Sequence, residues 1–157
     1  MNQRRSRKRG ITRRALLQRS LATLGWLLPA YVSAGEGTAA TAAAMASIVG
    51  KRAVTQGGIK LITPAIAENG NTVPLSVEVE GAFTPDRYVK AIHVFAEDNP
   101  SPEVISFFFT PAAGRAKVAS RIRLAKTQRV IALAEMSDDR MLETANEVKV
   151  TIGGCGG

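Results

Sequence analysis

The chain has 157 residues, with 21 Lys and Arg against 13 Asp and Glu, one His and one Cys. That length suits one ordinary domain, and a hydrophobic content of 45% is typical of a globular protein and excludes a broadly disordered one. One Cys excludes an internal disulfide framework, and one Cys with one His excludes a closed Cys/His zinc site.

The formal net charge of +8 belongs to the N-terminus. Eight basic residues lie before residue 20, where there is no acidic residue, and the other 13 balance all 13 acidic residues. A nucleic-acid-binding domain carries its positive charge on the folded surface. We therefore predict no nucleic-acid partner.

Residues 1–34 are predicted to be an export signal. A basic stretch precedes an apolar run over 21–28, and Val32-Ser33-Ala34 resembles a small-residue cleavage site. Within the basic stretch, Arg13 and Arg14 lie in Thr-Arg-Arg-Ala-Leu-Leu-Gln, which resembles the twin-arginine motif with Leu in place of Phe and Gln in place of Lys. The alternatives are a basic Sec signal and a membrane anchor, although the apolar run is shorter than the ~20 residues that span a bilayer.

We predict export to the periplasm by the twin-arginine route, with no membrane association after cleavage. Because that route moves folded proteins, the chain can fold or assemble before export. The mature chain would begin near Gly35, in an oxidising compartment.

The region after the signal begins with an Ala-rich stretch, for which we predict a short helix or a flexible leader over 39–50. Beyond Gly57-Gly58 the apolar period changes to two, as in strands with one buried and one solvated face. The clearest alternation lies at 75–79, 117–124 and 147–152.

Less regular strand segments are predicted at 59–62, 89–96, 104–110 and 129–135, with turns between strands, one of them at 68–71. About seven short strands with little helix predict an all-β fold, an Ig-like antiparallel β-sandwich without the disulfide of antibody domains. The predicted organisation is a signal at 1–34, an Ala-rich helix or leader at 35–57, the sandwich at 58–152 and an arm at 153–157.

Phe107, Phe108 and Phe109 form a consecutive aromatic run in one predicted strand. Successive strand side chains face opposite sides, so the three cannot all enter one core. Either the strand is buried on both faces, or one Phe faces a covering loop or a partner chain.

Searches for catalytic and nucleotide-binding motifs find none in the sequence. His93 is interpreted as a surface or structural residue, and Asp138-Asp139 as a solvated turn. A basic ridge around one hairpin either attracts small anions or an acidic partner, or is an ordinary solvated face. We therefore predict a non-catalytic protein with no cofactor and no metal site. The ridge consists of Arg115, Lys117, Arg121, Arg123, Lys126 and Arg129.

The chain ends in Gly153, Gly154, Cys155, Gly156 and Gly157, directly after the predicted strand. Glycines remove side-chain hindrance and leave the sulfur unshielded, so this segment is predicted to be a flexible arm. At ~3.3–3.6 Å per extended residue, Cys155 can reach roughly 10 Å from the domain. We predict that Cys155 is a site of covalent attachment.

Nothing nearby in the sequence activates the Cys155 thiol, and the negative C-terminal carboxylate disfavours its thiolate. We interpret the thiol as one on which a separate enzyme acts. In an oxidising compartment it would also form adducts or a Cys155 disulfide dimer. The alternative is a frayed tail with an incidental Cys.

Together these features resemble the SoxY family, the sulfur-carrying subunits of the SoxYZ complex of bacterial thiosulfate oxidation. The terminal Gly-Gly-Cys-Gly-Gly matches the family's attachment motif, and Val148–Ile152 leads into it as in that family. Asp139 departs from the family pattern, which has Gly in this turn. The resemblance spans about 55–157, and further similar segments lie at 64–70, 73–74, 99–102, 120–124 and 134–138.

The resemblance implies a sandwich paired with SoxZ and exported with it, and transient contacts with SoxAX, SoxB and SoxCD. It implies that SoxAX joins thiosulfate oxidatively to Cys155 and that SoxB then hydrolyses off sulfate. SoxCD, where present, would oxidise the remaining sulfur. Cys155 would bear each intermediate.

Two other functions are compatible with the sequence. A non-covalent periplasmic adaptor with an inert tail would not need Cys155. A thiocarboxylate on Gly157, as in small sulfur carriers, would need ATP-dependent activation in the cytoplasm, which the predicted signal disfavours. A free-standing enzyme is the least supported class, because no cluster of acids, bases or metal ligands is visible.

Overall fold

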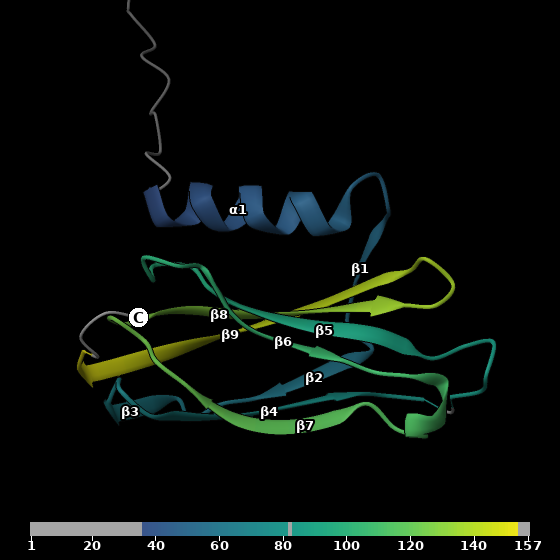
Figure 1. The fold of residues 1–157 in the computed structure, drawn as a ribbon. Coiled ribbons are helices and arrows are strands. Elements are labelled where there is room, and N and C mark those ends of the chain that lie inside the picture. Colours follow the sequence, from purple (N-terminus) through teal and green to yellow (C-terminus); the bar gives the residue numbers. More distant parts are fainter. Residues whose placement is uncertain (1–35, 82, 154–157) are drawn as a thin grey trace, which may run out of the picture. The chain divides into compact units, whose positions relative to one another are not determined.

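A computed structural model describes residues 36–81 and 83–153 (Figure 1). These residues form one α-helix, nine strands and one short 3-10 helix. The mostly β composition and the N-terminal helix are as predicted. In chain order the elements are α1 (Glu36–Val49), β1 (Val54–Gln56), β2 (Ile59–Ile62), β3 (Ile66–Asn69), β4 (Val73–Val79), β5 (Val89–Ala96), β6 (Glu103–Phe108), η2 (Pro111–Ala113), β7 (Lys117–Ile122), β8 (Gln128–Met136) and β9 (Met141–Ile152).

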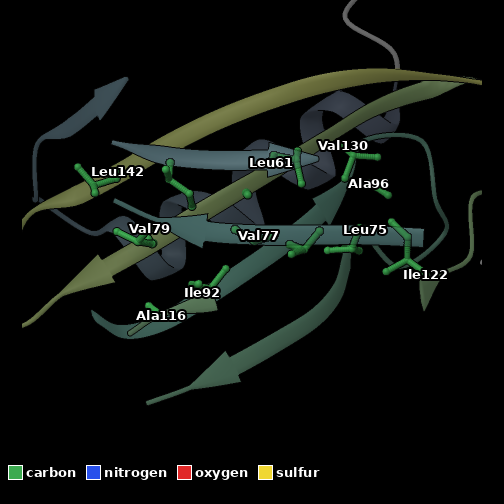
Figure 2. Packing of buried hydrophobic residues seen from close by; sticks show 14 of the residues in the cluster. Leu61, Leu75, Val77, Val79, Ile92, Ala96, Ala116, Ile122, Val130 and Leu142 are labelled. Atoms are coloured by element: carbon green, nitrogen blue, oxygen red, sulfur yellow. The ribbon is translucent and has the colours of Figure 1, made fainter. Parts of the chain in front are cut away.

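The strands form two sheets that share one apolar core. The larger sheet has the order β1-β9-β8-β5-β6, with β3 also paired to β9, and the smaller has the order β2-β4-β7. Alternating residues of both sheets meet between them, as Val77 of β4, Ile92 of β5 and Val130 of β8 illustrate (Figure 2). The predicted β-sandwich is therefore confirmed.

The sandwich differs from the prediction in strand number and direction. Two short strands were not predicted, β1 and β3, and both pair with β9 in parallel rather than antiparallel. β3 includes Glu68 and Asn69, which were assigned to a turn. All of β1 is exposed and only Ala67 of β3 is buried, so neither strand shows an alternating pattern that the sequence could reveal.

Helix α1 packs on the face of the larger sheet that is turned away from the main core (Figure 1). Met45 and Ile48 of the helix contact a second apolar cluster that includes Phe95, Leu133 and Met141. This cluster explains why β5 and β8 are buried on both faces and lack a clear period-two pattern.

The three phenylalanines divide between core and surface. Phe107 and Phe109 pack against the main core, while Phe108 is 78% exposed on the outer face of β6. The interpretation of a strand buried on both faces is therefore wrong at Phe108. The Phe108 ring lies edge-on to the His93 ring, with 6.1 Å between the centroids.

One ion pair ties the end of α1 to the larger sheet. Arg52 Nη1 lies 2.8 Å from Glu135 Oε1, and the Arg52 guanidinium also donates to the carbonyl oxygens of Val49 and Ile48. Burial raises the pKa of Glu135, but the hydrogen bond and positive charge of Arg52, together with the smaller effect of Lys90, outweigh burial and hold that pKa below its usual value. The pair therefore stabilises the fold above the usual pKa of a glutamate, and this contribution is lost as the pH falls through the lowered pKa.

We expect Arg52→Gln to lower the free energy of unfolding by about 1 kcal/mol near neutral pH. The ion-pair part of this loss should vanish in acid, where Glu135 is protonated in both proteins, while the loss of the helix-capping bonds should persist. Urea unfolding at several pH values measures both parts. The neighbouring exposed cation provides the control, Lys51→Gln, and a pH-independent difference for Arg52→Gln would show that the ion pair contributes nothing.

The β8–β9 turn contains Asp139 at the position where the family pattern has Gly. Its φ is 62°, in the left-handed region where side chains other than those of Asn and Asp are rare. Its carboxylate lies 3.7 Å from Lys90 Nζ and is 77% exposed, so this ion pair contributes little.

Asp139→Gly is therefore expected to raise the free energy of unfolding by about 0.5 kcal/mol, because glycine adopts this backbone conformation without steric cost. The matched control is Asp138→Gly, which should destabilise the protein, because the Asp138 carboxylate accepts a hydrogen bond from Arg140 Nε at 2.9 Å. Urea unfolding of both variants measures these changes. A midpoint of urea unfolding lower than that of the wild type for Asp139→Gly would contradict the argument that Asp139 strains the backbone.

Candidate functional site

The candidate site begins where β9 ends. Ile152 is the last residue of this strand, and Gly153 is the last residue that the structure describes. The predicted attachment residue Cys155, its neighbours Gly154, Gly156 and Gly157, and the signal arginines Arg13 and Arg14 lie outside the described residues. The structure therefore describes only the base of the predicted arm, which is formed by Ile152 and Gly153.

Hydrogen bonds from two loops fix the end of β9. The Gly70 amide donates to the Ile152 carbonyl oxygen at 2.7 Å, and the Gly70 carbonyl oxygen accepts from the Leu124 amide at 2.8 Å. The Val150 amide donates to Thr127 Oγ1 at 2.9 Å. Parallel pairing of β3 with Lys149, Val150 and Ile152 holds the same edge of β9 as the Gly70 bond, and Thr127 holds the opposite edge (Figure 1). The base of the arm is therefore rigidly placed.

Gly153 lies directly against the β7–β8 loop. A Cβ atom built on Gly153 would overlap the carbonyl oxygen of Ala125. The overlapping atom belongs to the backbone and cannot move aside as the end of a side chain would. The close approach of the Ala125 carbonyl therefore requires glycine at position 153. This reason is independent of the flexibility that the sequence predicted for the arm.

Two buried amide side chains hold the β7–β8 loop in place. Asn99 Nδ2 donates to the Arg123 carbonyl oxygen at 2.8 Å, and Asn99 Oδ1 accepts from the Ala125 amide at 3.0 Å and from Gln128 Nε2 at 2.9 Å. Gln128 Oε1 in turn accepts from the Asp98 amide at 2.7 Å. Both amide residues are 4% exposed. This network joins the β5–β6 loop to the loop that contacts Gly153.

The predicted basic ridge separates into paired and unpaired members. Lys117 pairs with Glu78, Lys126 with Asp98 and Arg129 with Glu97. For these three cations the interpretation of an ordinary solvated face holds. Within the described residues, Arg115, Arg121 and Arg123 have no carboxylate partner. Of these, Arg121 and Arg123 line a hollow of about 330 Å³ beside the β5–β6 loop.

The remaining candidate residues have structural roles. His93 is 7% exposed, and its Nδ1 lies 2.8 Å from Ser106 Oγ and 3.4 Å from Glu103 Oε1. Both partners approach the same ring nitrogen, so the three side chains do not form a relay in which the ring links a hydroxyl to a carboxylate. Asp138 and Asp139 form the predicted turn between β8 and β9.

The described residues contain neither a candidate metal site nor a candidate membrane-spanning helix. No group of three or more His, Cys, Asp or Glu side chains in this part of the chain is placed to hold a metal ion. Over the same residues, no helix combines the length and apolar character needed to cross a membrane.

Comparison with protein families adds a decisive observation. The model of the family described as sulfur oxidation protein SoxY matches residues 45–155, which include the whole sandwich and Cys155. The chain belongs to the SoxY family. The predicted resemblance is thereby confirmed, over a region that also includes the last turn of α1, residues 45–49.

A solved SoxY structure supports this assignment. The sulfur carrier protein SoxY from Chlorobium limicola f thiosulfatophilum is 30% identical, with a TM-score of 0.61, and the match covers 73% of this chain and 98% of that one. A comparison with curated protein sequences found no match.

Other solved structures share only the fold with this SoxY-family chain. Superoxide reductase (neelaredoxin) from Ignicoccus hospitalis is 15% identical, with a TM-score of 0.56 and coverage of 62% of this chain and 94% of that one. A hypothetical protein from Pyrococcus horikoshii is 14% identical, with a TM-score of 0.51 and coverage of 61% and 96%. These identities carry no conclusion about activity.

Sequence reasoning missed the residues that position the arm. Asn99 was noted only within the family-like segment 99–102, and Gln128 and Thr127 were not singled out. A buried amide in a loop has no periodic signature, and its role depends on contacts with segments distant in the sequence.

Proposed function

We propose that this SoxY-family protein carries sulfur intermediates covalently on Cys155 during the oxidation of thiosulfate or sulfide. The observation that carries the proposal is a Gly-Gly-Cys-Gly-Gly segment directly after a strand end that is fixed by two loops and a parallel strand. The fixed strand gives the thiol a defined origin, and the glycines leave it accessible. The family match to a sulfur oxidation protein supplies the nature of the cargo.

The carrier itself performs no chemistry in this proposal. Thiosulfate is joined to Cys155 by SoxAX, which takes up the electrons, SoxB releases sulfate by hydrolysis, and SoxCD oxidises the remaining sulfur where it is present. SoxZ forms the permanent heterodimer. The protein acts in the periplasm after export by the twin-arginine route, with Arg13 and Arg14 as the signal residues.

The experiment is intact-mass analysis of the protein purified from the periplasm of cells growing on thiosulfate, before and after treatment with a reductant. We expect adducts on Cys155 built from sulfur and sulfonate units, which the reductant removes, and an N-terminus near Gly35. A bare thiol under these conditions would contradict the carrier function and favour the non-covalent adaptor.

A further inference from the structure

The predicted arm is short compared with the domain that bears it. Cys155 lies two residues beyond Gly153, so even a fully extended chain places the two Cα atoms at most about 7 Å apart. An enzyme that encloses the Cys155 sulfur in a pocket must bring the mouth of that pocket against the residues around Gly153. The position of Gly153 in the fold therefore selects the surface that the enzyme covers.

Two arginines flank the turn that holds the end of β9. Arg121 Nη1 donates to Thr72 Oγ1 at 3.4 Å, in the turn between β3 and β4. Arg123 precedes Leu124, whose amide is bonded to Gly70 of the same turn. The Gly70 amide in turn bonds the Ile152 carbonyl oxygen. The segment that carries both arginines is thus connected to the base of the arm through the β3–β4 turn.

The chemical character of this surface is cationic and apolar. Arg121 and Arg123 are exposed, and the described residues offer neither of them a carboxylate partner. Glu103 lines the same hollow, and its carboxylate accepts a hydrogen bond from Ser106 Oγ at 2.5 Å. With two arginines against this one carboxylate, the charged side chains that line the hollow carry a net positive charge. Ile152, the last residue before Gly153, is 66% exposed. Arginine beside exposed apolar surface is typical of protein interfaces.

We propose that Arg121, Arg123 and Ile152 form the docking surface for SoxAX, the enzyme that loads the arm, and that the mouth of its pocket carries carboxylates around an apolar rim. This inference rests on the proposed function, because only a covalent carrier must present its thiol to an enzyme. Charge complementarity accelerates encounter of the two proteins and orients them before Cys155 enters the pocket.

The test compares two double variants of the SoxYZ complex that lose the same charge from the same segment. The first is Arg121→Gln with Arg123→Gln, and the control is Arg115→Gln with Lys117→Gln at the opposite end of β7. The measured quantity is kcat/KM for loading of Cys155 by SoxAX with thiosulfate, at several salt concentrations. We expect a fivefold to tenfold loss, about 1 to 1.4 kcal/mol, for the first variant at low salt. The loss should lie mainly in KM and shrink as salt is raised, with less than about a twofold effect in the control.

Loading of Cys155 without an enzyme distinguishes a loss of docking from a loss of thiol reactivity. Tetrathionate loads a thiol without an enzyme: the thiolate attacks a central sulfur, forms Cys–S–S–SO₃⁻ and releases thiosulfate. This rate should be equal in wild type and both variants. If SoxAX loads the wild type and the first variant equally well, or if the loss is independent of salt, the docking surface is overturned and the carrier function stands. If tetrathionate loads the wild type but SoxAX does not, both are overturned.

Discussion

Cys155→Ser is expected to abolish thiosulfate-dependent electron transfer in a reconstituted Sox system while leaving the fold intact. A serine hydroxyl is not ionised near neutral pH and cannot form the sulfur–sulfur bond that the intermediates require, so no partial activity should remain. The free energy of unfolding should change by less than about 0.5 kcal/mol, because the residue follows the last strand. Electron transfer to SoxAX measures the activity, and urea unfolding measures the stability.

A second variant separates the carrier from the alternative sulfur chemistry at the C-terminus. Gly157→Ala retains the thiol but alters the residue that a terminal thiocarboxylate would use. We expect this variant to keep its sulfur adduct and its activity. Activity that survives Cys155→Ser would overturn the carrier function, and loss of the adduct in Gly157→Ala alone would favour the thiocarboxylate.

Asn99→Ala is expected to lower the free energy of unfolding by about 3 kcal/mol. The substitution removes three hydrogen bonds at once and leaves the Arg123 carbonyl and the Ala125 amide without their side-chain partner. Gln128 Nε2 loses its bond to Asn99 and keeps the one to the Lys126 carbonyl oxygen. Each buried polar group that loses its partner costs about 1 kcal/mol or more. Because Ala125 contacts Gly153, the loop that supports the arm should also become mobile.

Urea unfolding and amide hydrogen exchange test this expectation. The control is Asn71→Ala, an exposed asparagine in the β3–β4 turn, which should change stability by less than about 0.5 kcal/mol. A double-mutant cycle with Gln128→Ala should show strong coupling, since the two amides share a hydrogen bond. A loss below about 1 kcal/mol for Asn99→Ala, with additive effects in the cycle, would show that the network does not support the loop.

Cys155→Ser and Asn99→Ala are expected to differ because the two residues have different roles. The proposed function requires the Cys155 thiol for the chemistry, and Cys155→Ser is expected to leave folding unchanged. Asn99 is remote from the reacting atoms and acts through Ala125 on the base of the arm. Asn99→Ala should therefore slow enzymatic loading while leaving chemical loading by tetrathionate unchanged.

The sequence alone was sufficient for features that depend on neighbouring residues. Period-two alternation predicted β4, β7 and the second half of β9, because the side chains of a half-buried strand alternate between core and solvent. The Ala-rich stretch predicted α1. The terminal glycines around Cys155 indicated an attachment site without reference to any contact, and the family match confirms the resemblance that they suggested.

Only the tertiary structure decided features that depend on residues far apart in the chain. β1 and β3 are strands because β9 pairs with them in parallel, and their own sequences are too short and too exposed to show it. The sequence showed six basic residues in a ridge, but ion pairs with neighbouring strands and loops neutralise Lys117, Lys126 and Arg129. Arg115, Arg121 and Arg123 have no carboxylate partner among the described residues. Alternation is a local property, whereas strand pairing and ion pairing are fixed by which distant segments the fold brings together.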